Sequence, residues 1–464
     1  MKAAMQTRRT CRYHPSLVAA LAFLVALGAG FAAPSAPAQE IAIQRVVGAS
    51  GIEAWLVEDH TVPVLSLRLA FRGGAALDPK GKEGLADMAS ALLDEGAGEL
   101  DSQAFRGRLE DLSISLRFNA GVDNFGADLR TLSENRAVAF DLLRLALIKP
   151  RFDPEPVERI RSQLLAHLSE LAESPRNIAS RTWFRAVFPD HPYGRASEGT
   201  PQSIARITAD DLRGFVKRRF GRDNLVIGVV GDITAADLAP LLDATFAALP
   251  ARAEPFEIPE VKPAAGGDVF VIAKKIPQSV AVFGGDGIKR DDPDYYAAYV
   301  MNHILGGGGF TSRLAEEVRE KRGLAYSVYN YLATFDHAGL IMGGVATAND
   351  RVAKSLELVR AEWARLRDAG VSAQELADAK TYLTGSFYTR LNSTRRMAGM
   401  LLSIQLDRLG IDYLERRNGL IGAVGLEDVR RVAKRLLDVE KLTFVVVGAP
   451  EGVNPTREAP RGGG

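Results

Sequence analysis

The fold is decided by residues 303–331, whose sequence is HILGGGGFTSRLAEEVREKRGLAYSVYNY. Four consecutive glycines, Gly306–Gly309, predict the end of one helix, because a glycine run is the strongest local stop signal. A second helix is expected to begin with Thr311 or Ser312 as its N-cap. Gly323 is expected to end that helix as a C′ residue. The stretch is therefore typical of two helices joined by a glycine loop.

Two side chains of this stretch are suited to chemistry. Residues 324–331 are rich in β-forming side chains and predict a strand after the second helix, whose apolar stripe is Leu314 and Val318. Arg319 falls in the last turns of that helix and Tyr326 near the start of the strand. A tight helix-to-strand corner can direct both tips to one place. A guanidinium and a phenol O–H are donors suited to a substrate carbonyl that becomes negatively charged.

The pattern SRLAEEVREKRGLAY, residues 312–326, resembles the C-terminal-half signature of the pitrilysin/insulinase family of zinc peptidases, the inverzincins. The resemblance implies that Arg319 and Tyr326 bind the substrate near the scissile bond. It also implies that two similar halves face each other as a clamshell, and that an active enzyme needs four such halves. Since this chain supplies two, the resemblance implies a second subunit.

An internal repeat determines the expected architecture. Residues 207–233, ITADDLRGFVKRRFGRDNLVIGVVGDI, align without gaps to residues 424–450, VGLEDVRRVAKRLLDVEKLTFVVVGAP. Each copy falls near the end of one half of the chain. Both halves mix predicted hairpins with consecutive helices, which favours an α+β fold. We therefore predict two homologous α/β-sandwich domains with mainly antiparallel sheets.

Composition divides the chain into five segments. A positive n-region, an apolar stretch and an Ala-Pro-Ala site at 36–38 predict a secretory signal peptide, the alternative being an uncleaved anchor. Four prolines mark a linker between the domains. The last residues are rich in proline, glycine and charge, which predicts disorder. The segments are 1–38 (signal peptide), 41–250 (N-terminal domain), 251–266 (linker), 267–450 (C-terminal domain) and 451–464 (tail).

The zinc motif of the family is degenerate in this chain. Catalytic members carry H-x-x-E-H on a helix, where two histidines hold Zn²⁺ and the glutamate activates water. The helix predicted over residues 83–95 carries Asp87-Met88-Ala89-Ser90-Ala91 at these five positions. Asp87, Ser90 and Ala91 cannot replace two histidines and the base.

The third zinc ligand of the family, a glutamate on a later helix, is also missing. One register from Glu158 places Leu165 at that position. The register that matches Glu158-Arg159-Ile160-Arg161 to the family's E-R-E-R run places His167 there, and we prefer it. The alternative for His167 is an ordinary surface histidine. We predict that this chain has no cofactor or metal of its own.

Composition narrows the function further. The net charge of +1 provides no basic field for nucleic acid. The only cysteine, Cys11, lies in the predicted signal peptide, so an exported chain relies on its core for stability. We predict a periplasmic, non-catalytic, substrate-binding subunit of a heterodimeric zinc peptidase whose partner carries H-x-x-E-H and zinc. The alternative is a structural or peptide-binding protein, possibly a homodimer, without a part in catalysis.

Overall fold

The N-terminal half is built on a mixed six-stranded sheet with the order β1-β2-β6-β3-β5-β4. The computed structural model describes residues 41–460, so the predicted signal peptide lies outside the described residues. Only β2 and β6 pair in parallel; the other neighbours are antiparallel. The strands are β1 (Gln44–Val47), β2 (Glu53–Glu58), β3 (Val64–Arg72), β4 (Ser115–Ala120), β5 (Asn124–Leu132) and β6 (Leu225–Gly231).

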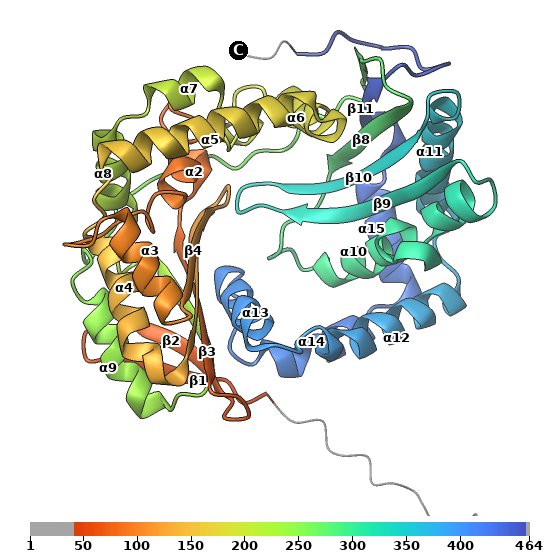
Figure 1. The fold of residues 1–464 in the computed structure, drawn as a ribbon. Coiled ribbons are helices and arrows are strands. Elements are labelled where there is room, and N and C mark those ends of the chain that lie inside the picture. Colours follow the sequence, from red (N-terminus) through yellow and green to blue (C-terminus); the bar gives the residue numbers. More distant parts are fainter. Residues whose placement is uncertain (1–40, 461–464) are drawn as a thin grey trace, which may run out of the picture. The chain divides into compact units, whose positions relative to one another are not determined.

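Helices cover this sheet (Figure 1). Thr208 caps α8 in a capping box with Asp211, as their spacing indicates. The helix expected over residues 83–95 is shorter, because α2 ends at Ser90 and a series of turns follows. The helices are α2 (Leu85–Ser90), α3 (Ser102–Asp111), α4 (Arg136–Ile148), α5 (Pro154–Glu173), α6 (Pro175–Val187), α7 (Pro201–Arg206), α8 (Ala209–Arg219) and α9 (Ala235–Phe246).

The C-terminal half repeats this plan on a five-stranded sheet with the order β7-β11-β8-β10-β9. Its strands are β7 (Val269–Ala273), β8 (Gln278–Asp286), β9 (Ala325–Thr334), β10 (Gly339–Ala348) and β11 (Thr443–Gly448). Its α-helices are α10 (Tyr295–Asn302), α11 (Val352–Ala369), α12 (Ala373–Thr389), α13 (Thr394–Leu406), α14 (Tyr413–Gly422) and α15 (Leu426–Leu436). Its parallel pair is β7 with β11, which involves the last strand of the half, as the pair of β2 with β6 does in the N-terminal half.

The predicted repeat is visible in the matching elements. Helix α8 and strand β6 occupy the same positions of the repeat as α15 and β11. Both strands end in a glycine with positive φ, 137° at Gly231 and 153° at Gly448. A Cβ at either position would lie within 2.5 Å of an atom of the neighbouring strand, Val64 or Ser279. The same backbone constraint therefore operates in both halves.

Each half places one helix on the sheet of the other half (Figure 1). Helix α6 packs on β8 and β11, while α13 packs on β3 and β6. The indole N–H of the buried Trp183 in α6 donates to the carbonyl of Thr443 at 3.2 Å. The described residues from Ile43 onward form one compact unit. The prediction of an α+β fold with two similar, facing halves and mainly antiparallel sheets is confirmed.

The segments outside the two sheets are held by specific contacts. Residues 251–266 contain no helix or strand, and the amide of Val261 donates to the carbonyl of His337 at 3.0 Å. The composition after residue 450 predicts disorder, whereas Thr456 exchanges hydrogen bonds of 2.9 Å with Val269 at the start of β7. These contacts fix the described part of the tail, which ends at residue 460.

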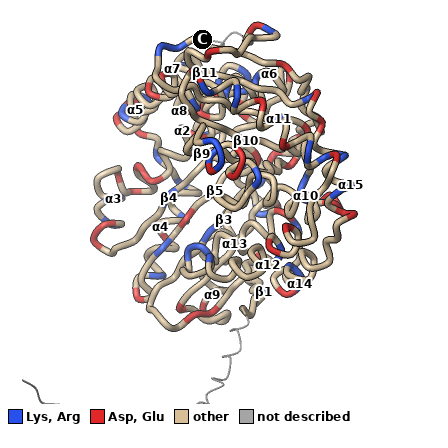
Figure 2. The backbone as a smooth tube through the Cα atoms, turned by 90° about the vertical axis from the view of Figure 1, so that its right-hand side faces the viewer, with Lys and Arg blue, Asp and Glu red and all other residues tan. Residues whose placement is uncertain are grey.

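Charge and hydropathy add two observations. Basic and acidic residues alternate over the face shown in Figure 2 without forming a field of one sign. Within residues 41–460, no helix is both long and apolar enough to cross a membrane.

Candidate functional site

The stretch between α10 and β9 contains two π turns, which the sequence did not predict. Helix α10 continues as a π turn, η4 (His303–Gly307), in which the Gly308 amide donates to the His303 carbonyl at 2.8 Å. A 3₁₀ turn, η5 (Gly309–Thr311), follows. The second helix is mainly a π turn, η6 (Ala315–Glu320). π turns are rare and are frequent at functional sites.

The ends of this second helix agree only in part with the prediction. The hydroxyls of Thr311 and Ser312 donate to the carbonyls of Gly308 and Gly309, at 3.0 and 2.7 Å, and cap no helix. The predicted N-cap is therefore wrong, because the preceding 3₁₀ turn uses both hydroxyls. Gly323 does end the helix, with a φ of +59°. The amide of the next residue, Leu324, donates to the carbonyl of Val318 at 2.9 Å.

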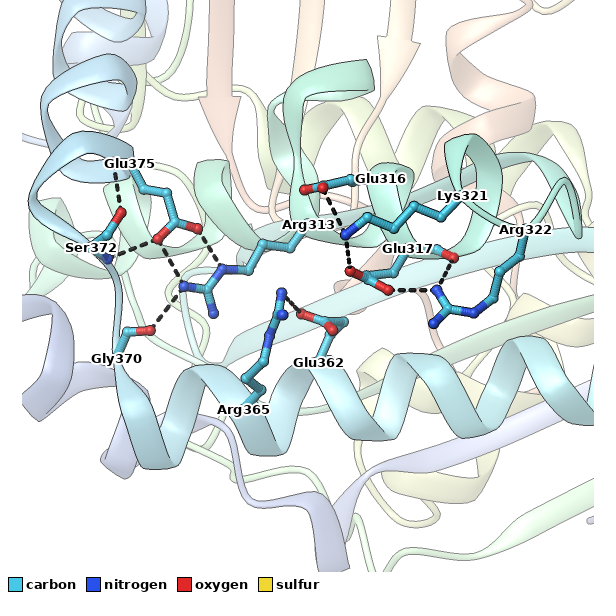
Figure 3. Close-up of polar contacts among 10 residues, drawn as sticks. All are labelled: Arg313, Glu316, Glu317, Lys321, Arg322, Glu362, Arg365, Gly370, Ser372 and Glu375. Carbon is cyan, nitrogen blue, oxygen red and sulfur yellow. Dashed lines mark hydrogen bonds and ion pairs between the residues drawn. The ribbon is translucent and has the colours of Figure 1, made fainter.

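Ion pairs with a spacing of five residues fit the π turn. Lys321 contacts Glu316 at 2.8 Å and Glu317 at 2.7 Å, and Arg322 contacts Glu317 at 2.5 Å (Figure 3). The two cations lower the pKa of Glu317, Lys321 contributing most. Hydrogen bonds of a π turn join residues five apart. The pairs Glu316–Lys321 and Glu317–Arg322 therefore connect side chains that this turn brings together.

A nearly buried arginine joins the same segment to α12. The side chain of Arg313 makes two hydrogen bonds to the Glu375 carboxylate, at 2.7 and 2.9 Å, and one to the Gly370 carbonyl at 3.0 Å (Figure 3). Glu375 also completes a capping box with Ser372 at the start of α12. Arg313 lowers the pKa of Glu375 to about 2. Arg313 thus fixes the start of the segment that carries Arg319 to helix α12 and to the Gly370 carbonyl before it.

Arg319 and Tyr326 come together at the exposed tip of this segment. The guanidinium carbon of Arg319 lies 5.1 Å from the centre of the Tyr326 ring. Tyr326 has no partner in the register of β9 and β10, since Ala346 pairs with Ser327 and Thr347 with Ala325. Bulges of this kind redirect a side chain. Tyr326 is 80% exposed, and its hydroxyl has no hydrogen-bond partner within the described residues.

Phe310 is the residue of this site that the sequence analysis missed. It follows the glycine run, and its side chain is 64% exposed. The guanidinium carbon of Arg319 lies 3.9 Å from the centre of the Phe310 ring, so the cation is held between two aromatic rings. The available signal was a large apolar residue directly after four glycines, a place where a polar loop residue is usual. We refer to Phe310, Arg319 and Tyr326 as the aromatic–arginine cluster.

Helix α2 does not offer a zinc site. The Ser90 hydroxyl donates to the Asp87 carbonyl at 2.8 Å, and Ala91 has no ligand atom. Burial raises the pKa of Asp87, the Glu198 carboxylate raises it further, and His167 opposes both. Among residues 41–460, no three His, Cys, Asp or Glu side chains are grouped so that they could hold a metal ion.

The structure distinguishes the two registers for the third ligand position. His167 is close enough to Asp87 to affect its pKa, and its Nδ1 lies 3.7 Å from Glu170. Leu165 instead packs against the apolar core of the first half. Of the two candidates for the third ligand position, His167 is therefore the residue that lies near α2, and Leu165 is not.

Comparisons with known proteins bear on the family of this chain. The peptidase M16 inactive domain matches residues 206–383. A crystal structure of a peptidase M16 inactive domain from Pseudomonas fluorescens is 31% identical, with a TM-score of 0.83, covering 90% of this chain and all of that chain. The chain belongs to the pitrilysin/insulinase family, M16. The prediction from the SRLAEEVREKRGLAY pattern is confirmed.

Two further comparisons extend over most of the chain. A protein from Helicobacter pylori named non-peptidase homolog YmxG is 29% identical over 398 residues, which is 84% of this chain and 90% of the relative. The crystal structure of a protease from Helicobacter pylori has a TM-score of 0.79 at 18% identity, covering 88% of this chain and 99% of that chain. The second likeness concerns the fold alone.

Proposed function

We propose that this chain is the non-catalytic, substrate-binding subunit of an exported, heterodimeric zinc metallopeptidase. The observation that supports it most is the aromatic–arginine cluster, which presents a guanidinium and a phenol O–H in a chain whose α2 lacks the histidine pair of the zinc motif. A homologous partner with H-x-x-E-H supplies zinc and the attacking water. Arg319 and Tyr326 act in trans on the carbonyl of the scissile peptide bond.

The chemistry of the two donors suits this role. Acyl transfer develops negative charge on the carbonyl oxygen, and preorganised donors stabilise that charge in the transition state. The Tyr326 hydroxyl is exposed, and the guanidinium of Arg319 has one ion pair among the described residues, with Glu320 at 3.4 Å. A surface pair of that kind is weak. Both donors are therefore available to a peptide.

The name of the Helicobacter pylori relative supports a member of the family without peptidase activity. In this chain, Asp87, Ser90 and Ala91 occupy the motif positions of H-x-x-E-H, and no metal-holding group occurs within residues 41–460. Export to the periplasm and assembly with a second subunit are parts of the proposal that rest on the N-terminal sequence and on the family's need for four halves.

The experiment is a peptide-cleavage assay on complexes reconstituted with a homologous H-x-x-E-H subunit. Tyr326→Phe removes one O–H, and we expect turnover to fall by up to the range of about 10²–10³ typical of a lost oxyanion donor. Arg319→Ala should reduce turnover at least as much and also weaken peptide binding, because the charged donor acts in the ground state too. Zinc in the partner and assembly by gel filtration should not change.

Two variants serve as matched controls. Tyr388→Phe changes a second exposed tyrosine, which is 45% exposed and whose hydroxyl donates a long hydrogen bond of 3.5 Å to the Leu414 carbonyl. Arg144→Ala removes an arginine of similar exposure that pairs with Asp141 at 2.6 Å. Full activity of both Tyr326→Phe and Arg319→Ala would refute the proposal. Activity lost together with assembly would favour the structural alternative.

A further inference from the structure

We infer that Phe310 is a positioning residue for Arg319, and that the glycine run before it serves to present this ring to the guanidinium. The inference deepens the proposed function and rests on it for its catalytic consequence. Its structural part concerns this chain alone.

The geometry of the cluster carries the inference. Of the two rings beside Arg319, Phe310 is the closer, at 3.9 Å against 5.1 Å for Tyr326. A planar guanidinium stacked on a ring face keeps its N–H groups at its edge, free for a carbonyl. Arg319 has an ion pair only with its neighbour Glu320 among the described residues, at 3.4 Å. The aromatic stack is therefore the main contact that fixes the head of this side chain.

The backbone explains how the ring reaches this place. The π turn η4 ends at Gly307, and the next two glycines lead into the 3₁₀ turn that carries Phe310. Gly309 has a φ of +61°, in the left-handed region that favours glycine. A Cβ on Gly308 would lie 2.8 Å from the His303 carbonyl. Side chains at these positions would disturb the turn that aims Phe310 at Arg319.

Exposure argues against a role in the core. The Phe310 ring is 64% exposed, so it contributes little to the apolar core of the second half. The contact that the structure shows for this ring is the one with the Arg319 guanidinium. An arginine side chain loses much rotamer freedom when it binds, and a stack restricts that freedom before the substrate arrives. A misplacement of about 1 Å can cost about 10²-fold in rate.

The first measurement tests the stack in the full chain without any partner. Arginine labelled with ¹³C and ¹⁵N reports the δ-proton signal of Arg319, assigned by its loss in Arg319→Lys. In the unaltered chain we expect an upfield ring-current shift. Phe310→Leu should reduce it to the contribution of the more distant Tyr326 ring, whereas Phe310→Trp and Phe310→Tyr should retain it, because both keep an aromatic face. Thermal unfolding should be the same in all variants. An Arg319 signal that Phe310→Leu leaves unchanged would overturn the inference.

The second measurement uses complexes with the H-x-x-E-H subunit. Phe310→Leu should lower kcat by about 3- to 10-fold with little change in KM, since exposed cation–π contacts shift populations by a few-fold. Phe310→Trp should restore kcat. An effect confined to KM, or one that varies with the peptide side chain beside the scissile bond, would overturn positioning in favour of direct substrate contact.

The two measurements separate this inference from the proposed function. If Arg319→Ala reduces turnover and Phe310→Leu does not, the positioning role is refuted while the proposed function stands. If Tyr326→Phe and Arg319→Ala both leave turnover intact, the proposed function fails, and the catalytic part of this inference fails with it. The arginine signal then shows by itself whether the stack exists.

Discussion

The ion pair between Arg313 and Glu375 gives a sharp test of how the aromatic–arginine cluster is held. Replacing Glu375 by Gln keeps the size of the side chain and its place in the capping box, because Gln also serves at that position. It removes only the charge that faces Arg313, whose side chain is 9% exposed. The guanidinium is then left nearly buried without its counter-ion, which is costly.

The magnitude follows from the pKa of Glu375, which Arg313 and, to a smaller extent, the hydrogen bonds from Ser372 lower from 4.5 to about 2 against the effect of burial. A pKa unit corresponds to about 1.4 kcal/mol, so the full shift is worth about 3.4 kcal/mol. Because the Glu375 side chain is 34% exposed, solvent screening reduces this to about 2 kcal/mol. We therefore expect Glu375→Gln to lower the free energy of unfolding by about 2 kcal/mol at pH 7.

The sign of the pH dependence is fixed by the same shift. A carboxyl group with a depressed pKa contributes stability above its unfolded pKa and loses it as the pH falls toward the folded one. The difference between the parent chain and Glu375→Gln should therefore be constant from pH 7 to about 5.5. It should shrink by roughly a third to a half at pH 3.5.

The assay is urea unfolding followed by circular dichroism at several pH values. Glu357→Gln is the control, since the Glu357 side chain is 66% exposed and pairs with Lys354 at 2.8 Å. It should change stability by less than about 0.5 kcal/mol. Combining Glu375→Gln with Arg313→Met should cost less than the sum of the single changes. A difference that is below 0.5 kcal/mol at pH 7, or independent of pH, would refute the reasoning.

Three further predictions follow from the described contacts. Gly323→Ala should destabilise the chain by about 1–2 kcal/mol, because its φ of +59° is strained for alanine. The cost is one of backbone strain alone, since no atom lies within 4 Å of the added Cβ. Gly385→Ala, inside α12 and equally free of contacts, should stabilise the chain by about 0.5–1 kcal/mol in the same urea assay. Trp183→Ala should cost about 3–5 kcal/mol and loosen both halves together, which hydrogen exchange of β11 would detect. The purified chain should bind no zinc and cleave no peptide, and one tightly held zinc per chain in metal analysis would contradict this.

Local signals predicted most of the elements correctly. The Thr208–Asp211 spacing located the start of α8, and alternation located the hairpin of β4 and β5. The repeat predicted two halves with the same plan. These features succeed because capping, alternation and repetition act between residues that are close in sequence or occur twice.

Long-range contacts explain what the sequence did not predict. The Arg313–Glu375 pair joins residues 62 positions apart, and only the fold brings them together. Helix α6 packs on the sheet of the second half and α13 on the sheet of the first half. Each contact depends on a sheet whose strands are distant in the sequence from the helix. The sequence predicts an ordinary helix over η6, because Leu314 and Val318 are spaced i, i+4, whereas the structure has a π turn there. Phe310 was missed because its partner, Arg319, meets it only through that turn.

The contacts around Arg319 differ between its base and its tip, and the difference bears on the proposed role. At the base, Arg313 and Glu317 connect the segment to α12 and to its own last turn through several charge-assisted hydrogen bonds. At the tip, Phe310 and Tyr326 are largely exposed and hold the guanidinium between them. Donors stabilise a transition state best when they need no reorganisation at the moment of reaction. Because the contacts that fix this arrangement all lie within the second half, the donors are already in place before a partner or a peptide arrives.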